Sequence, residues 1–105
     1  MTLRPLDLFA PAPRFANLEA LFAAIEAFGD DPLKVHGTRI VICRGNPGAR
    51  LMLIGEAPGA DEDRLGQPFV GRSGQLLDQI LRSVGFDPAV EAFVTNAVYR
   101  RPPEN

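Results

Sequence analysis

The sequence predicts an α/β fold built around a parallel sheet. Residues 50–55 predict a strand whose apolar run, residues 51–54, is typical of an interior parallel strand. A glycine-rich loop follows over residues 55–74, and apolar residues at helical spacing predict a helix from about residue 74 to residue 84. Residues 92–95 predict another strand. A strand, a helix and a strand joined by a short return form a βαβ unit, so we expect the two strands to be parallel neighbours.

The composition narrows the class of protein. The 105 residues suffice for one small domain, and a content of 46% hydrophobic and 23% charged residues is that of a globular protein. The net charge of −2 does not indicate a dominant basic field for nucleic-acid binding. The single cysteine, Cys43, excludes an internal disulfide and a CxxC metal site. Neither a signal peptide nor a membrane-spanning run is evident, so we expect a cytoplasmic protein without a membrane partner.

The amino-terminal part is expected to be an arm followed by one helix. Residues 1–16 contain several prolines and no clear period. Asn17 is a suitable N-cap for an amphipathic helix that would pack on a core and stop at Gly29. We therefore divide the chain into an arm and helix, residues 1–38, and the domain segment, residues 39–105.

The remaining elements complete one edge of the predicted sheet. The β-branched run at residues 38–43 predicts a strand, and the sequence GNPG at residues 45–48 predicts a turn. Asn96, at the end of the last strand, should emerge at the same sheet edge as Glu56. Two or three strands with one or two helices leave faces uncovered and edges unpaired, so the sheet is expected to be incomplete.

The glycine-rich loop carries groups suited to ligand binding, because open α/β sheets bind ligands beyond the carboxyl ends of their strands. Its four closely spaced carboxylates are Glu56, Asp61, Glu62 and Asp63. A carboxylate can orient or deprotonate a water, Phe69 can stack on a planar ring, and Asn96 offers one donor and one acceptor. The alternatives are solvated loop charges, a core position for Phe69, a strand-end cap at Asn96, and a helix start capped by Ser73. The residues by themselves indicate a small-molecule or nucleobase site.

Several spaced motifs make the chain similar to a known family. They are GEAPG at 55–59, ED at 62–63, GxPFVG at 66–71, GxLL at 74–77, TN at 95–96 and RPPxN at 101–105. In this order they resemble the uracil-DNA glycosylase superfamily, and within it the family 4 type. The resemblance implies a three-layer α/β/α sandwich with a parallel central sheet, of which this chain holds the amino-terminal half. It also implies hydrolysis of the N-glycosidic bond of deoxyuridine in DNA, a step of base excision repair.

The resemblance assigns a role to each matching residue. Glu56 and Ala57 match the wall of the uracil pocket, and Glu62 matches the carboxylate that positions or activates the water. Phe69 matches the ring that stacks on the flipped base, and Asn96 matches the amide that reads the uracil edge, so Glu62 and Asn96 are the expected catalytic residues. The turn expected to approach DNA phosphates through its backbone consists of Gly71, Arg72, Ser73 and Gly74.

The chain also departs from the family pattern. Family 4 members typically hold an iron–sulfur cluster on four cysteines, but residues 30–33 contain no thiol and Arg100 stands where a third ligand is expected. We therefore expect no cluster and no other metal. Members are about twice as long, and their histidine motif has no counterpart in His36, which we expect at the surface. The expected partner is uracil-containing DNA. The alternatives are a non-catalytic remnant that binds nucleic acid or nucleotides, and a different metal-assisted phosphate or nucleotide binder.

Overall fold

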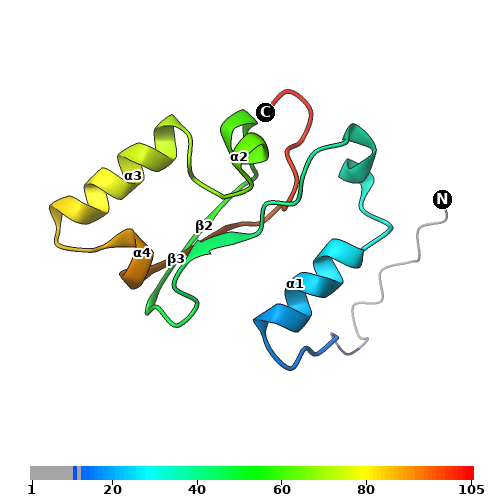
Figure 1. The fold of residues 1–105 in the computed structure, drawn as a ribbon, viewed down its shortest axis with the longest axis horizontal. Coiled ribbons are helices and arrows are strands. Elements are labelled where there is room, and N and C mark those ends of the chain that lie inside the picture. The colour runs from blue at the N-terminus through cyan, green and yellow to red at the C-terminus, as the bar shows by residue number, and fades with distance from the viewer. Residues whose placement is uncertain (1–10, 12) are drawn as a thin grey trace. The chain divides into compact units, whose positions relative to one another are not determined.

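The computed structural model describes residue 11 and residues 13–105. The chain separates into two compact units, one that ends at Pro32 and one from Leu33 to Asn105. Figure 1 shows the elements of both. None of the helices described is long and apolar enough to cross a membrane.

The first unit contains the predicted helix, α1 (Leu18–Ala27). Its N-cap is Asn17, whose Oδ1 accepts a hydrogen bond of 2.9 Å from the N–H of Ala20, so the predicted helix start is confirmed. None of the α1 residues is buried, and the predicted packing on a core stays a prediction. The expected arm, residues 1–16, lies mostly outside the described residues.

The second unit is built on a three-stranded sheet of order β1-β3-β2. Its strands are β1 (Cys43–Gly45), β2 (Leu51–Gly55) and β3 (Ala92–Asn96). Strands β2 and β3 pair in parallel, which confirms the predicted βαβ relationship. Strand β1 pairs with β3 in the antiparallel direction, so the sheet is mixed and the prediction of a purely parallel sheet is wrong for the strands described. The mixed α/β class is confirmed, whereas the three-layer sandwich stays a prediction.

The strand predicted at residues 38–43 is displaced in the structure. Only Cys43 of that run lies in β1, and the strand continues to Gly45, which was expected to begin a turn. The β-branched run is apolar because Val41 is fully buried, not because it pairs in the sheet. The N–H of Val41 donates instead to the carbonyl of Tyr99, at 2.8 Å. Burial and strand pairing leave the same apolar signature in a sequence, which explains the error.

Strand β2 lies at an edge of the sheet rather than in its interior. Its Met52 and Ile54 are 52% and 63% exposed, while Val94 of the central strand β3 is fully buried. The side chains of β2 are apolar on both faces of the sheet, but in the structure described the face that carries Met52 and Ile54 is not covered. The prediction that β2 is an interior strand is therefore wrong in the structure described. The interior strand of this sheet is β3.

Helices occupy more of the chain than predicted. Helix α3 (Arg72–Ser83) matches the predicted helix but begins two residues earlier, and Gly85 follows it with a φ of 86°. The short helices α2 (Ala60–Leu65) and α4 (Pro88–Glu91) were not expected, and neither was the 3₁₀ helix at Pro32–His36. His36 is exposed in it, as predicted. Helix α2 lies inside the glycine-rich loop. Three acidic side chains in its first turn stabilise the helix through the partial positive charge of its amino end.

Candidate functional site

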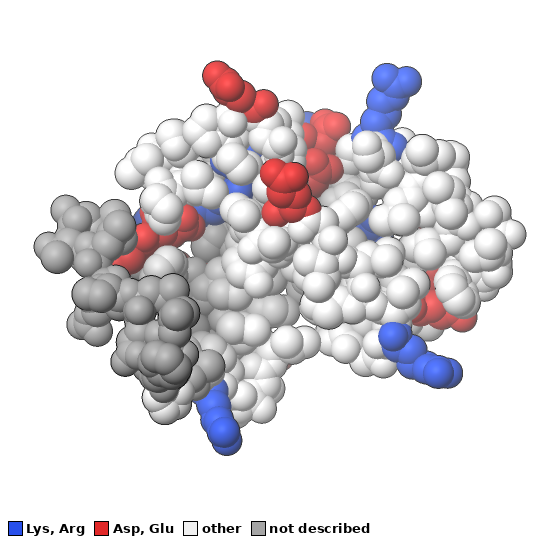
Figure 2. Space-filling view, turned by 180° about the vertical axis from the view of Figure 1, so that it is seen from behind, with Lys and Arg blue, Asp and Glu red and all other residues white. Residues whose placement is uncertain are grey.

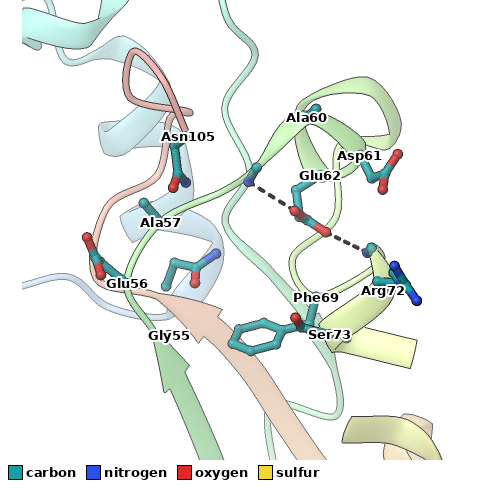
Figure 3. Close-up of a pocket in the computed structure, with 14 residues that line it drawn as sticks. Gly55, Glu56, Ala57, Ala60, Asp61, Glu62, Phe69, Arg72, Ser73 and Asn105 are labelled. Atoms are coloured by element: carbon teal, nitrogen blue, oxygen red, sulfur yellow. Dashed lines mark hydrogen bonds between the residues drawn. The ribbon is translucent and has the colours of Figure 1, made fainter. Parts of the chain in front are cut away.

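A pocket of about 420 Å³ opens at the carboxyl ends of β2 and β3, between these strands and the loop that contains α2 (Figure 3). All nine residues that the sequence predicted for the site line it: Glu56, Ala57, Glu62, Phe69, Gly71, Arg72, Ser73, Gly74 and Asn96. Five further lining residues had been given no site role, although Asp61 was among the loop carboxylates noted in the sequence: Gly55, Gly59, Ala60, Asp61 and Asn105. The predicted positions are therefore brought together in one cavity, while their roles stay predictions.

The parallel pairing of the strands places Asn96 beside the first motif. Asn96 is the register partner of Gly55, and pairing continues past the strand ends through a 2.8 Å hydrogen bond from the N–H of Ala97 to the carbonyl of Gly55. The expectation that Asn96 and Glu56 emerge at one edge is confirmed. Asn96 is only 4% exposed, whereas Glu56 is exposed at the pocket rim. The amide of Asn96 is thus a nearly buried polar group in the wall of an open cavity.

The ring of Phe69 reaches the same point from the loop. A Cβ atom at Gly55 would overlap this ring and would lie 2.5 Å from Oδ1 of Asn96. The ring and the amide therefore meet over the bare backbone of Gly55. Phe69 has a φ of 58°, a left-handed conformation that is a true outlier for a bulky residue and that recurs at functional sites. An aromatic face beside a buried amide can hold a planar, hydrogen-bonding ring.

The carboxylate of Glu62 joins two segments of the loop by accepting hydrogen bonds from the backbone of both. Its Oε1 accepts from the N–H of Gly59 at 2.9 Å, and its Oε2 accepts from the N–H groups of Val70 and Gly71 at 3.0 and 2.6 Å. Figure 3 shows Glu62 between the two segments that it joins. A carboxylate has about four acceptor positions, so three of them are filled by backbone and about one is left for a water.

The turn at residues 71–74 begins helix α3. Its N-cap is Gly71, so the alternative in which Ser73 caps the helix is wrong. Gly74 is buried, and a Cβ atom there would overlap the backbone of Phe69, so the absence of a side chain permits this close packing. Arg72 and Ser73 are exposed in the first turn, where the N–H groups lack intrahelical acceptors. This part of the turn can face an anionic ligand.

The unpredicted lining residues had signals in the sequence. Gly55 and Gly59 are the first and last residues of the GEAPG motif, and Asn105 is the last residue of the RPPxN motif. Nδ2 of Asn105 donates to the carbonyl of Pro58 at 2.8 Å, which places the last motif against the first. Asp61 forms an exposed ion pair of 3.2 Å with Arg64. Only the folded chain shows that these residues share one cavity.

Charge does not dominate the face of the molecule in Figure 2. On the face in Figure 2, positive and negative side chains are interspersed, and neither sign forms a continuous area. Among residue 11 and residues 13–105, no three His, Cys, Asp or Glu side chains are grouped to hold a metal ion.

The thiol of Cys43 does not suit an iron–sulfur cluster. Such a cluster needs four thiolates, and Cys43 is the only cysteine in the sequence. Burial raises the pKa of the Cys43 thiol, which disfavours the thiolate that a metal requires. The residues of this chain do not fit the cluster of family 4.

Comparison with known proteins shows which family the chain is similar to. The model of the Uracil DNA glycosylase superfamily matches residues 42–105. A Type-4 uracil-DNA glycosylase of Thermotoga maritima is 42% identical over 74 residues, which cover 70% of this chain and 38% of that protein. Proteins of the same name from Pyrobaculum aerophilum and Archaeoglobus fulgidus are 39% and 46% identical, over 85% and 58% of this chain and over 45% and 30% of their own lengths.

The chain thus spans less than half the length of these relatives. The matched region begins at Ile42 and contains all three strands and the whole pocket. More than half of the chain is covered by the family model, and its motifs line one cavity. The chain belongs to the uracil-DNA glycosylase superfamily.

Proposed function

We propose that this chain carries the base pocket and the water side of a uracil-DNA glycosylase, which hydrolyses the N-glycosidic bond of deoxyuridine in DNA. The observation that carries the proposal is the meeting of the Phe69 ring and the buried Asn96 amide over Gly55, inside a cavity at the carboxyl edge of the sheet. The names of the relatives, Type-4 uracil-DNA glycosylase, support it.

Asn96 is the group proposed to read the base. Its amide has an acceptor for the N3–H of uracil and a donor for an adjacent carbonyl oxygen. Cytosine presents the opposite pattern at these positions, which would leave a nearly buried amide unpaired and weaken binding. Phe69 supplies the stacking face, and Glu56 and Ala57 form part of the wall.

The proposed reaction is a hydrolysis. A water attacks C1′ of the sugar, the bond from C1′ to N1 breaks, and its electron pair leaves with uracil as an anion. The water proton passes to a base or to solvent. A donor aimed at a uracil oxygen stabilises this anion more than the neutral base, so Asn96 would lower the barrier. We propose that Glu62 positions the water through the acceptor capacity that its three backbone hydrogen bonds leave.

The proposed partner is uracil-containing DNA. The target base must leave the stack to enter the pocket, at a cost of a few kcal/mol that is least for a mispaired or single-stranded base. The backbone at Gly71, Arg72, Ser73 and Gly74 is proposed to approach the phosphates, with Arg72 and Ser73 as its exposed part. We further propose that this chain works without an iron–sulfur cluster, so purified protein should contain only traces of iron and acid-labile sulfide.

The test is uracil release from a single-stranded oligonucleotide with one uracil, at excess protein, with circular dichroism of the same sample. Release that is lost in Glu62→Ala supports the proposal. Saturable, uracil-dependent binding without release by the folded chain would instead indicate the non-catalytic remnant. A folded chain with neither release nor a preference for uracil contradicts both.

A further inference from the structure

We infer that Arg44 is a positioning residue that holds the backbone of Phe69 in the conformation needed to present its ring, an inference that rests on the function proposed above. Arg44 lies in β1, far from the loop in sequence. Its Nε donates to the carbonyl of Pro68 at 2.7 Å, and its Nη2 donates to the carbonyl of Phe69 at 3.0 Å and to Oδ1 of Asp78 at 2.9 Å.

The two carbonyls define the backbone of Phe69. The carbonyl of Pro68 lies in the peptide plane before the Phe69 Cα atom, and the carbonyl of Phe69 lies in the plane after it. The angle between these planes is set by φ and ψ of Phe69. One rigid guanidinium that binds both carbonyls therefore restricts both angles. Phe69 needs this restriction because its φ of 58° is unfavourable for a residue with a large side chain.

Helix α3 completes the arrangement from the other side. Gly74 packs against the Phe69 backbone, and Asp78, one helical turn later on the same face, receives the guanidinium. The side chains of Arg44 and Asp78 are only 12% and 22% exposed. A charged group that is mostly buried can stay ionised when it is paired with an opposite charge and hydrogen-bonded. Here the ion pair with Asp78 also orients the planar guanidinium of Arg44.

Of the three hydrogen bonds of Arg44 given above, the one to the carbonyl of Phe69 reaches a residue that lines the pocket. Arg44 itself is absent from the residues that line the cavity, whereas the Phe69 ring lies against Gly55 and next to Asn96. The loss of Arg44 should therefore change where the ring lies without removing any group that touches the base. This separates a positioning role from a catalytic one.

The first test observes the ring directly and does not depend on activity. The seven phenylalanines are replaced by 4-fluorophenylalanine, and the ¹⁹F signal of Phe69 is assigned from its loss in Phe69→Leu. Arg44→Met should shift and broaden this signal. The matched control Arg82→Met removes an exposed arginine of α3 and should leave it unchanged.

An unchanged Phe69 signal in folded Arg44→Met overturns the inference. If Arg44→Met does not fold, Arg44→Lys decides. A single ammonium keeps the charge beside Asp78 but lacks the planar fork for both carbonyls, so a smaller shift of the Phe69 signal is expected. No shift in folded Arg44→Lys also overturns the inference.

The second test separates the inference from the proposed function. The ratio of affinities for uracil-containing and cytosine-containing single strands is measured for four chains: the parent, Arg44→Met, Phe69→Leu and the double variant. Arg44→Met should lower the ratio by roughly tenfold, as for a lost base–aromatic stack. It should change nothing further in the Phe69→Leu background. Equal losses in both backgrounds would contradict action through Phe69. If the parent chain binds uracil-containing and cytosine-containing strands equally, the proposed function is contradicted. The ¹⁹F experiment then tests the positioning role of Arg44 independently of that function.

Discussion

The ring of Phe69 lies directly against the Cα atom of Gly55, where any side chain would overlap it. The amide of Asn96 borders the same point, with its Oδ1 2.5 Å from the position of a Cβ atom at Gly55. The two groups proposed to stack on and to read the base thus meet at Gly55, which has no side chain to separate them. Gly55 is the last residue of β2, so the sheet itself sets this spacing.

Gly55→Ala should therefore displace the ring or the amide. We expect uracil preference or uracil release to fall by at least about tenfold, because a small misplacement of positioning groups has a large effect on rate. The matched control is Gly48→Ala, where a Cβ atom would make only an ordinary contact of 3.5 Å with Oδ1 of Asn46. The measurement is the affinity ratio for uracil and cytosine single strands, with release assayed in parallel. Equal values for the parent and Gly55→Ala would show that the ring and amide do not form the base site.

Asn96→Asp should cripple recognition of uracil. The substitution replaces the amide donor by a carboxylate, which repels the uracil oxygens and the departing anion. We expect release to slow by about 10²-fold or more, the size of effect seen when one donor to a developing anion is removed. Gln79→Glu is the matched control, because it makes the same change of charge on the exposed face of α3. Release by Asn96→Asp at the parent rate would mean that the base is read by another group.

Glu62→Ala should affect both stability and rate. Three backbone N–H groups lose a charged acceptor, so we expect the free energy of unfolding to fall by about 2–4 kcal/mol in urea titrations. The control Asp61→Ala removes an exposed ion pair and one of the acids in the first turn of α2, and should cost about 1 kcal/mol or less.

Under conditions where Glu62→Ala is folded, release should be about 10²-fold slower while DNA affinity stays nearly intact. A reduced stability together with an unchanged rate would leave Glu62 as a structural residue of the loop and remove it from the mechanism.

Cys43 should react slowly and should make stability sensitive to alkaline pH. Burial raises the pKa of the Cys43 thiol in the folded chain, so less thiolate is present than in the unfolded chain. Alkylation by iodoacetamide near pH 8 should be several-fold slower in the folded chain than in urea. Because the folded pKa lies above the unfolded one, the associated stability is fully present below the unfolded pKa and is lost as pH rises through the folded pKa.

The check on this linkage is urea unfolding of the parent and of Cys43→Ala between neutral and alkaline pH. The parent should lose more stability over this range than Cys43→Ala, since all other titrating groups are shared. Parallel losses in the two proteins would show that burial does not perturb the thiol.

Local patterns predicted those features that depend on neighbouring residues. The stop near Gly85 and the apolar spacing predicted α3, and Asn17 predicted the start of α1. The hidden helix α2 shows the limit of this reasoning. Its sequence has glycines at both ends and acids in the first turn, a pattern that is also typical of a solvated loop. The structure shows a helix, in which Glu62 accepts a hydrogen bond from the N–H of the N-cap residue Gly59.

Sequence alone predicted nine of the residues that line the pocket, because the motifs name them and the βαβ rule brings the ends of β2 and β3 to one edge. Tertiary structure decided what each group faces. The carboxylate of Glu62 turns to backbone N–H groups, Arg44 reaches two carbonyls of the loop from β1, and β3 rather than β2 becomes the central strand. These outcomes depend on contacts between residues distant in the chain. Spacing along the sequence records which side chains are present, but only pairing in space settles which atoms they contact.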